Sequence, residues 1–425
     1  MKKHHSDRHG RQCSFVLAAL ALTACASGPA IAQLEEADHQ EPSRPTQSTE
    51  HNISPALYDL RGAWADAAIL PLTLRHMDDI FLSRTVAHSG TPWEIPRNDH
   101  ALNFTYEADG ETYQAEEVLD RTYTNALLII KDGRIVYETY RNGSDETDRF
   151  AGFSMTKSIT SIMIGCAVEE GRLNINKPVD DYLPELKGGG YEGVTVKQIL
   201  QMRSGADRNE DYSNLRNTDV IKPGSPTASM RDNIDRYADA ALTVERSWEP
   251  GSHFNYLNLD TAVLGWVIER VTQRSIASYT TQCLWEPLGA EADGYFFMDG
   301  EPGVGREFNV AGYNATLRDW ARIGLMMLNK GVAKNRVISE AWVAESTASV
   351  STEQNDGWGY GYQWWTVEGS EAYSARGKYG QYVYVDPTTN TVIAKMSHIP
   401  VAANSSGVRQ EMDAFFKAAS AWTPE

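Results

Sequence analysis

The chain has 425 residues, with 39 Lys and Arg against 57 Asp and Glu, so its formal net charge at pH 7 is −18. This excess of acidic side chains disfavours nucleic acids and anionic membrane surfaces as binding partners. Without its N-terminal leader and linker the chain keeps about 365 residues, more than one simple core holds, so we expect one functional unit made of two packed subdomains.

The N-terminal 32 residues have the pattern of a bacterial export signal. A basic, polar stretch precedes a short apolar run, 14–24, that is too short to span a membrane. Leu22-Thr23-Ala24-Cys25 has the pattern of a lipobox, in which Cys25 becomes the lipidated first residue; cleavage after Ala32 is the alternative. We therefore expect an exported protein, periplasmic or held at the membrane only by a lipid on Cys25.

Residues 33–60 are expected to form a flexible linker, because they are rich in Glu, Gln, Ser, Thr and Pro and contain few large apolar side chains. The folded part is expected over 61–425. It contains two cysteines, Cys166 and Cys283, which do not form a zinc-type cluster. Their apolar, helical surroundings favour buried thiols over a disulfide, although an exported protein could pair them.

A β-hairpin followed by a buried helix is predicted in the first half of the folded part. The strand-like runs 125–130 and 134–140 flank Asp132-Gly133, which is typical of a tight turn. Further on, Ile159, Ile162, Met163 and Cys166 recur at helical spacing, and Gly171 stands where a left-handed C-cap would end the helix.

Ser154 falls in the first turn of that helix, and Lys157 follows three positions later on the same face. Free backbone N–H groups at this end of a helix can stabilise an oxyanion, and a buried lysine beside a serine can act as a base. A bare Ser-x-x-Lys string is more often a helix cap followed by a solvated lysine. It is also a signature of penicillin-recognising serine enzymes, so partner motifs downstream decide its meaning.

Three further stretches follow in chain order. A short helix is predicted within 194–205, and the polar stretch 206–230 after it is a candidate substrate lid that carries Tyr212. An extended segment then presents Tyr256 and Asn258 ahead of a buried helix that begins near residue 259. Taken alone, Tyr212 is an ordinary surface tyrosine, Tyr256 a core tyrosine and Asn258 a helix N-cap.

Six ordered segments make the chain resemble the serine β-lactamase-like family, which includes class C β-lactamases, DD-peptidases, family VIII carboxylesterases and aminohexanoate-dimer hydrolases. The Asn-Glu-Asp-Tyr stretch, the tryptophan pair and the Gly-x-x-Gly-Gln segment are most similar to the last branch. The segments are Phe153-Ser154-Met155-Thr156-Lys157-Ser158, residues 200–205, Tyr256-Leu257-Asn258, residues 312–322, Tyr360-Gly361-Tyr362-Gln363-Trp364-Trp365 and Gly377-Lys378-Tyr379-Gly380-Gln381.

The resemblance implies an α/β (α+β) fold of the β-lactamase/transpeptidase type, with an antiparallel sheet flanked by helices. It also implies an inserted all-helical subdomain over about 153–340. The pattern of the C-terminal part agrees independently, because 379–385 alternates like a strand, 391–397 returns as another and 407–422 is amphipathic like a helix. These late strands are expected to pair beside the early hairpin.

The resemblance also implies a serine hydrolase of small esters or linear amides. Ser154 would form the acyl-enzyme, Lys157 and Tyr256 would share the acid and base roles, and Asn258 would orient Lys157 or the substrate. The backbone N–H groups of Ser154 and Lys378 would form the oxyanion hole, in a segment that also holds Gly377 and Gly380. Neither a metal nor an organic cofactor is called for.

Two alternatives remain open at the level of sequence. The first is a β-lactamase or D-amino-acid peptidase acting on cell-wall-related substrates. Against it stands Ala375-Arg376-Gly377, where those enzymes keep Lys-Thr/Ser-Gly, although Arg376 could replace the charge if its side chain points inward. The second is a non-catalytic, penicillin-binding-like surface lipoprotein, which would have no need to retain Ser154, Lys157 and Tyr256 together.

Overall fold

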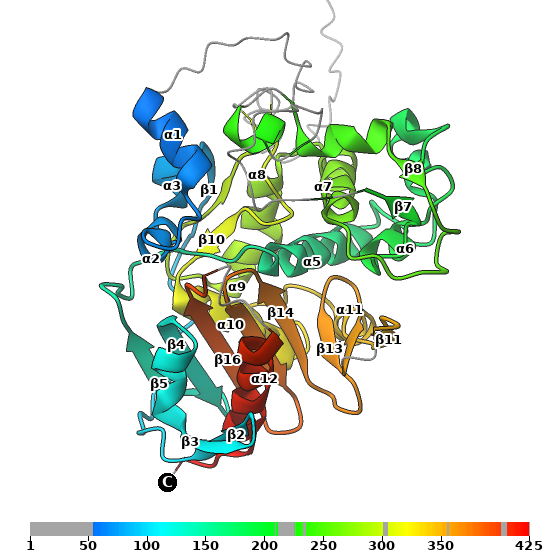
Figure 1. Cartoon of the computed structure of the whole chain (residues 1–425). Helices are drawn as coiled ribbons and strands as arrows, with labels where there is room; N and C mark the ends of the chain where they lie inside the picture. The colour runs from blue at the N-terminus through cyan, green and yellow to red at the C-terminus, as the bar shows by residue number, and fades with distance from the viewer. Residues whose placement is uncertain are drawn as a thin grey trace, which may run out of the picture. The chain divides into compact units, whose positions relative to one another are not determined.

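An eight-stranded antiparallel sheet and a layer of helices beside it dominate the structure (Figure 1). The computed structural model describes residues 54–208, 210, 225, 227–232, 235–300, 305–354, 357–400 and 406–424. The expected signal segment with Cys25, and Tyr212 in the expected lid, lie outside the described residues. Within the described part, no helix has the length and apolar character needed to cross a bilayer.

The main sheet joins strands from the two ends of the folded chain. Strand β16 pairs antiparallel with β4 from Thr391↔Lys131 to Ser397↔Thr124, and so closes the C-terminal strands onto the early hairpin. In sheet order the strands are β11 Val350–Ser351, β12 Trp358–Tyr360, β13 Trp365–Val367, β14 Tyr373–Gly377, β15 Gln381–Asp386, β16 Thr391–Ser397, β4 Thr124–Lys131 and β5 Arg134–Tyr140.

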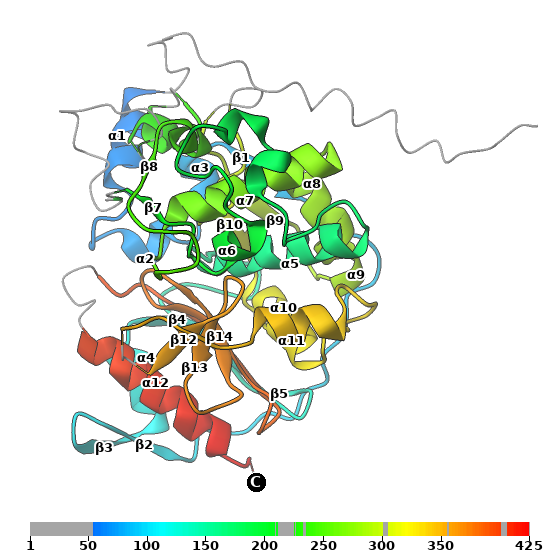
Figure 2. The same cartoon turned by 90° about the vertical axis from the view of Figure 1, so that its right-hand side faces the viewer.

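Different helices cover the two faces of this sheet (Figure 2). Helix α12 (Ser406–Ala421) places Phe416 against Tyr382 and Tyr384 of β15. The opposite face packs on α10 (Leu317–Leu328), where a Cβ at Gly324 would come within 2.7 Å of the side chains of Val383 and Val392. Strand β4 is buried along its whole length because both faces are covered.

Ten further helices and six shorter helical turns complete the described part of the chain. They are α1 Pro55–Ala63, α2 Leu70–Thr73, α3 Met77–Ile80, α4 Val118–Arg121, α5 Met155–Glu169, α6 Val196–Leu200, α7 Asn258–Thr272, α8 Ile276–Thr280, α9 Glu286–Leu288 and α11 Glu340–Ser346, with shorter helical turns η2 Ala115–Glu117, η3 Val179–Asp181, η4 Pro184–Leu186, η5 Thr227–Arg231, η6 Tyr237–Leu242 and η7 Thr281–Trp285. Thirteen of the fifteen residues of α5 are buried, so this helix lies in the core.

The smaller sheets include strands that fall within 153–340, so this stretch is largely helical but not all-helical as expected. A four-stranded sheet has the order β1 Ser83–Val86, β9 Gly294–Phe297, β10 Tyr313–Ala315 and β6 Phe150–Ala151. Two-stranded sheets are β2 Thr105–Ala108 with β3 Glu111–Gln114, and β7 Ala206–Asp207 with β8 Glu245–Arg246. Strand β6 leads directly into the turn before Ser154, so the four-stranded sheet helps to hold that turn.

Most predicted elements are confirmed, with two shifts of boundary. The early hairpin, helix α5 with Gly171 at a φ of +71°, and the C-terminal strands and helix lie where the pattern put them. Helix α6 ends at Leu200, before the expected stop at Gly205. Helix α1 begins inside the range expected to be linker, with Ser54 as its N-cap. The helix is held to the folded part through Arg61, which is buried and whose Nε lies 2.8 Å from the Ile80 carbonyl oxygen.

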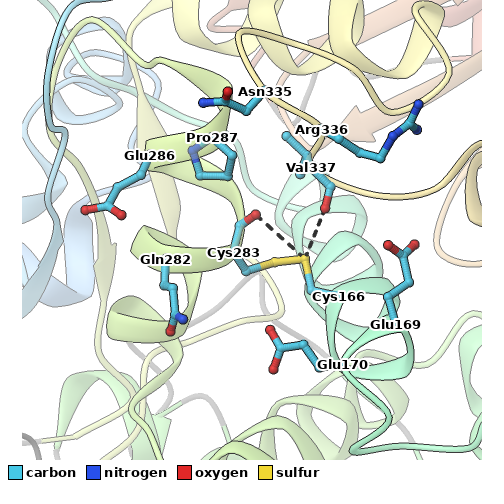
Figure 3. A pocket seen from close by; sticks show the side chains of 10 residues that line it. All are labelled: Cys166, Glu169, Glu170, Gln282, Cys283, Glu286, Pro287, Asn335, Arg336 and Val337. Carbon is cyan, nitrogen blue, oxygen red and sulfur yellow. Dashed lines mark hydrogen bonds between the residues drawn. A yellow bond between two sulfur atoms is a disulfide. The ribbon is translucent and has the colours of Figure 1, made fainter. Parts of the chain in front are cut away.

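The expectation of two buried thiols is wrong, because Cys166 and Cys283 form a disulfide. Cys166 lies near the end of α5 and Cys283 in η7, and the two positions are 117 residues apart in sequence. The disulfide lines a pocket of about 540 Å³ together with Glu169, Glu170 and Arg336. Figure 3 shows these side chains around the pocket. Sequence spacing could not reveal the pair, because the packing of η7 against α5 brings the sulfurs together.

Candidate active site

A strained turn presents Ser154 at the N-terminus of α5. Phe153 has a φ of +46°, which is unusual for a residue with a side chain, and the N–H of Met155 donates to the Gly152 carbonyl oxygen at 3.0 Å. The Phe153 ring stacks on Trp64 at 5.5 Å and meets Tyr379 edge-on at 5.1 Å. These contacts hold the turn in place, so the position of Ser154 is fixed before any substrate arrives.

Lys157 is buried and its amine faces three oxygen atoms. Its Nζ lies 3.0 Å from Oγ of Ser154, 2.7 Å from Oδ1 of Asn258 and 3.1 Å from the carbonyl oxygen of Val310. Only 1% of the residue is exposed. Burial disfavours the ammonium form and lowers the pKa of Lys157 to about 7. The amine can therefore be neutral near physiological pH.

Tyr256 lies above this amine, inside an aromatic cluster. Nζ of Lys157 is 5.1 Å from the centre of the Tyr256 ring, which stacks on Trp365 at 5.4 Å and meets Tyr360 edge-on at 5.9 Å. Burial raises the pKa of the Tyr256 phenol above its ordinary value, and a hydrogen bond with the hydroxyl of Ser154 acts in the opposite direction. The phenol therefore stays protonated while the neighbouring lysine can lose its proton.

Asn258 is the first residue of α7, and the N-cap position belongs to Leu257, whose side chain makes no capping hydrogen bond. The reading of Asn258 as a helix N-cap is therefore wrong. Its side chain turns to Lys157 instead. The reading of Tyr256 as a plain core tyrosine also fails, because its ring contacts the amine of Lys157.

The end of β14 touches the turn before Ser154. A Cβ built on Gly377 would come within 2.2 Å of the Gly152 carbonyl oxygen, so only glycine permits this close approach. Lys378 follows directly, with its Nζ 5.2 Å from the centre of the Tyr379 ring. Gly380 has a φ of +86° and packs against Ile399, so it shapes the turn between β14 and β15.

Two side chains near the site differ from the expectation. Trp364 is fully buried and packs edge-on against Tyr373, so of the tryptophan pair it is Trp365 that contacts Tyr256. Arg376 stacks its guanidinium over Trp358 at 4.0 Å and lies 3.5 Å from Asp413 of α12. The carboxylate of Asp413 thus partly balances the charge of Arg376. Arg376 still acts to lower the pKa of Tyr256.

Two residues that support the site were not singled out from sequence. Gln363 has a φ of +62°; its backbone carbonyl accepts from Ser158 of α5 at 2.7 Å and its side-chain oxygen accepts from Thr261 of α7 at 2.7 Å. It directly precedes the tryptophan pair, inside a motif that was quoted for the resemblance without a role for the glutamine. Glu210 belongs to the Asn-Glu-Asp-Tyr stretch, where only the tyrosine drew attention; its carboxylate binds the first turn of α7.

A helix-borne serine, a buried lysine within hydrogen-bond distance of it and a tyrosine over the amine, all beside an antiparallel sheet, together define a β-lactamase-fold serine hydrolase. No group of three or more His, Cys, Asp and Glu side chains in the described part of the chain is arranged to hold a metal ion.

The chain belongs to the Beta-lactamase family, whose profile matches residues 116–410. A 6-aminohexanoate-dimer hydrolase of Paenarthrobacter ureafaciens is 35% identical over 299 residues, which cover 67% of this chain and 75% of that protein. Among solved structures, a Bacillus anthracis protein assigned as a 6-aminohexanoate-dimer hydrolase matches with a TM-score of 0.74 and 24% identity, over 88% of this chain and 98% of that one. A family VIII carboxylesterase matches with a TM-score of 0.53 and 16% identity, over 72% and 96%.

These similarities confirm the expected family, the β-lactamase/transpeptidase-like fold and the assignment as a hydrolase. The 35% identity to a hydrolase also argues against a non-catalytic binding lipoprotein.

Proposed function

We propose that the protein cleaves small esters or linear amides through a covalent acyl-enzyme on Ser154. The observation that carries this proposal is the surroundings of the Lys157 amine. A neutral amine has two N–H donors and one lone pair, and here two of its three neighbours, Asn258 Oδ1 and the Val310 carbonyl, can only accept. The lone pair is left for the third neighbour, the hydroxyl of Ser154, at 3.0 Å.

In the proposed reaction, Lys157 takes the proton of Ser154 as Oγ bonds to the substrate carbonyl carbon. The resulting oxyanion accepts hydrogen bonds from the backbone N–H groups of Ser154 and Lys378. The bond to the leaving group then breaks, and Tyr256 protonates the departing oxygen or nitrogen and regains its proton from Lys157. Water repeats the sequence on the acyl-enzyme, so the acid product leaves and Ser154 is restored.

The proposed substrates are short, weakly charged acyl compounds. Tyr256 and Trp365, which stack on each other, and Tyr360, which meets Trp365 edge-on, offer an apolar wall beside the lysine. A β-lactam carboxylate would need a cation in the place where this chain has Ala375-Arg376-Gly377, and the charge of Arg376 is shared with Asp413. The 35% identity to a 6-aminohexanoate-dimer hydrolase supports the same choice of linear amides or esters.

Two further parts of the proposal rest on residues outside the described part of the chain. The phenol of Tyr212 would donate a hydrogen bond to the scissile amide nitrogen, so Tyr212→Phe should impair amide cleavage more than ester cleavage. Export with lipidation at Cys25, or with cleavage after Ala32, would place the enzyme at or outside the inner membrane. Intact-mass analysis of the mature protein distinguishes a lipidated Cys25 from an unmodified Gln33.

The proposal is tested with purified protein that lacks residues 1–32. A fluorophosphonate should label the wild type and leave Ser154→Ala unlabelled, while thermal unfolding of the variant stays close to that of the wild type. The wild type should cleave short-chain p-nitrophenyl esters with a kcat/KM at least about a hundredfold above that for nitrocefin, since one lost charge-assisted contact is worth roughly 2.7 kcal/mol. Equal labelling of the variant, or faster nitrocefin turnover, would instead favour another nucleophile or the lactamase and peptidase alternative.

A further inference from the structure

Glu210 accepts three hydrogen bonds, two of them from the N-terminal end of α7. Its Oε2 accepts from the backbone N–H of Asn258 at 2.7 Å, and its Oε1 accepts from the backbone N–H of Leu259 at 2.9 Å. The hydroxyl of Tyr237 in η6 also donates to Oε1, at 2.7 Å. A residue from the stretch after β7 thus holds two other elements together.

The end of α7 has a physical need for such a partner. The first backbone N–H groups of a helix have no intrahelical acceptor and carry the positive end of the helix dipole. At this helix of 15 residues the N-cap position is Leu257, whose side chain makes no capping hydrogen bond. The carboxylate of Glu210 therefore performs the capping function from a distant part of the chain.

Asn258 connects this cap to the site. Its N–H donates to Glu210, and its side-chain Oδ1 accepts from Nζ of Lys157 at 2.7 Å. One residue is therefore held by the carboxylate on one side and holds the amine on the other. A shift of the first turn of α7 would move the oxygen that orients Lys157.

The charge of Glu210 also reaches the reacting groups. It raises the pKa of Lys157, against the larger lowering by burial, and it contributes to the raised pKa of Tyr256. Asp260 also faces this region: it is buried, its Oδ1 accepts from Tyr191 at 2.7 Å, and burial raises its pKa to about 7. A positive charge also lies beside Tyr237, since the guanidinium of Arg208 is 5.6 Å from the centre of that ring.

We propose that Glu210 is a positioning residue that holds Asn258 in place through the α7 cap and favours the protonated form of Lys157 through its charge. This rests on the proposed function, because it assigns Lys157 the role of accepting the Ser154 proton. Glu210 itself touches neither Ser154 nor Lys157 through any hydrogen bond of the structure, so it acts through Asn258 and through its charge.

The test compares the pH dependence of kcat/KM for a p-nitrophenyl ester between the wild type and Glu210→Gln. Glutamine can still accept one backbone N–H but removes the negative charge that favours the protonated lysine. The acidic limb of the profile should move to lower pH by about half a unit or more, since a nearby opposite charge stabilises the charged form of a lysine. The plateau value should also fall several-fold because Asn258 is held less firmly. Glu210→Asp keeps the charge but withdraws it by one methylene, so its limb should move the same way by less.

Two control variants separate the effect of removing the Glu210 charge from the effect of loosening the α7 cap. Ser339→Ala removes the side-chain cap of α11, 3.1 Å from the Trp342 N–H, and should leave the limb in place. Tyr237→Phe removes one hydrogen bond from Glu210 but keeps its carboxylate, and should not move the limb to lower pH. The proposal is overturned if the acidic limb of the kcat/KM profile stays in place in both Glu210 variants. It is also overturned if either control variant shifts that limb as much as Glu210→Gln does. A wild type without esterase activity would instead contradict the proposed function, which is measured first.

Discussion

Oδ1 of Asn258 lies 2.7 Å from Nζ of Lys157, closer than the 3.0 Å between that amine and Oγ of Ser154. The two residues come from different helices, α7 and α5, and are 101 positions apart in sequence. An amide oxygen at this distance accepts an N–H without adding a charge. It therefore orients the amine, while burial lowers the pKa of Lys157 and the charge of Glu210 acts in the opposite direction.

The pH profile of the wild type should follow from the lowered pKa of Lys157. Below about pH 7 the lysine is protonated and cannot accept the Ser154 proton, and above it the neutral base predominates. We expect kcat/KM for an ester to rise roughly tenfold per pH unit up to about pH 7 and then to level off. A profile that keeps rising to pH 9 would mean that Lys157 retains an ordinary lysine pKa.

Asn258→Asp should move that profile in the opposite direction from Glu210→Gln. A carboxylate at hydrogen-bond distance favours the ammonium form, so the pKa of Lys157 should rise by about one unit or more, and the acidic limb should move to higher pH. Asn258→Ala, which removes the acceptor without adding charge, is the matched variant and should lower kcat with a smaller displacement of the limb. If the Asn258→Asp profile coincides with that of the wild type, the side chain of Asn258 does not act on the amine of Lys157.

Lys157→Ala and Tyr256→Phe should each lower kcat/KM by about a hundredfold or more, the usual range for a lost acid or base group. Because Nζ of Lys157 lies 5.1 Å from the Tyr256 ring centre and the two exchange one proton in the proposed reaction, the losses should not add. The double variant should be at most a few-fold slower than the slower single variant. Multiplied losses, measured on the same ester, would show that the two residues act in separate steps.

The neighbouring tryptophans should respond differently to the same substitution. Trp365→Leu removes the ring that stacks on Tyr256 at 5.4 Å, so activity should fall while the melting temperature changes little. Trp364→Leu leaves a cavity in the core and should cost roughly 2–4 kcal/mol of unfolding free energy. Thermal unfolding and ester kinetics on both variants check this, and a larger loss of stability in Trp365→Leu would reverse our placement of the pair.

The disulfide should matter for stability and not for chemistry. Cys166 lies twelve positions after Ser154 on α5, a distance of about 18 Å at 1.5 Å per residue. Closing a loop of 117 residues stabilises the folded chain by up to about 5 kcal/mol through the entropy of the unfolded state. The double variant Cys166→Ser, Cys283→Ser should therefore melt at a lower temperature and keep its kcat/KM below that temperature. A loss of activity in the still-folded variant would mean that the disulfide holds the Ser154 end of the helix as well.

The sequence by itself determined the elements whose signal is local. The Asp132-Gly133 turn, the alternation in 391–397 and the spacing of Ile159, Ile162 and Met163 each predict an element that the structure contains. The Ser-x-x-Lys spacing likewise determined that Ser154 and Lys157 would meet, because three residues along a helix bring side chains onto one face. Such patterns depend only on the backbone period, so no distant part of the chain is needed to interpret them.

Only the tertiary structure decided the relations between distant segments. The disulfide, the turn of Asn258 away from capping and toward Lys157, and the choice of Trp365 over Trp364 all depend on how α5, α7 and the end of the sheet pack together. Glu210 is the clearest case, since a single acidic residue in a polar stretch carries no signal of its own. Its role arises because the end of α7 lacks a side-chain cap and packing brings that carboxylate to the free N–H groups.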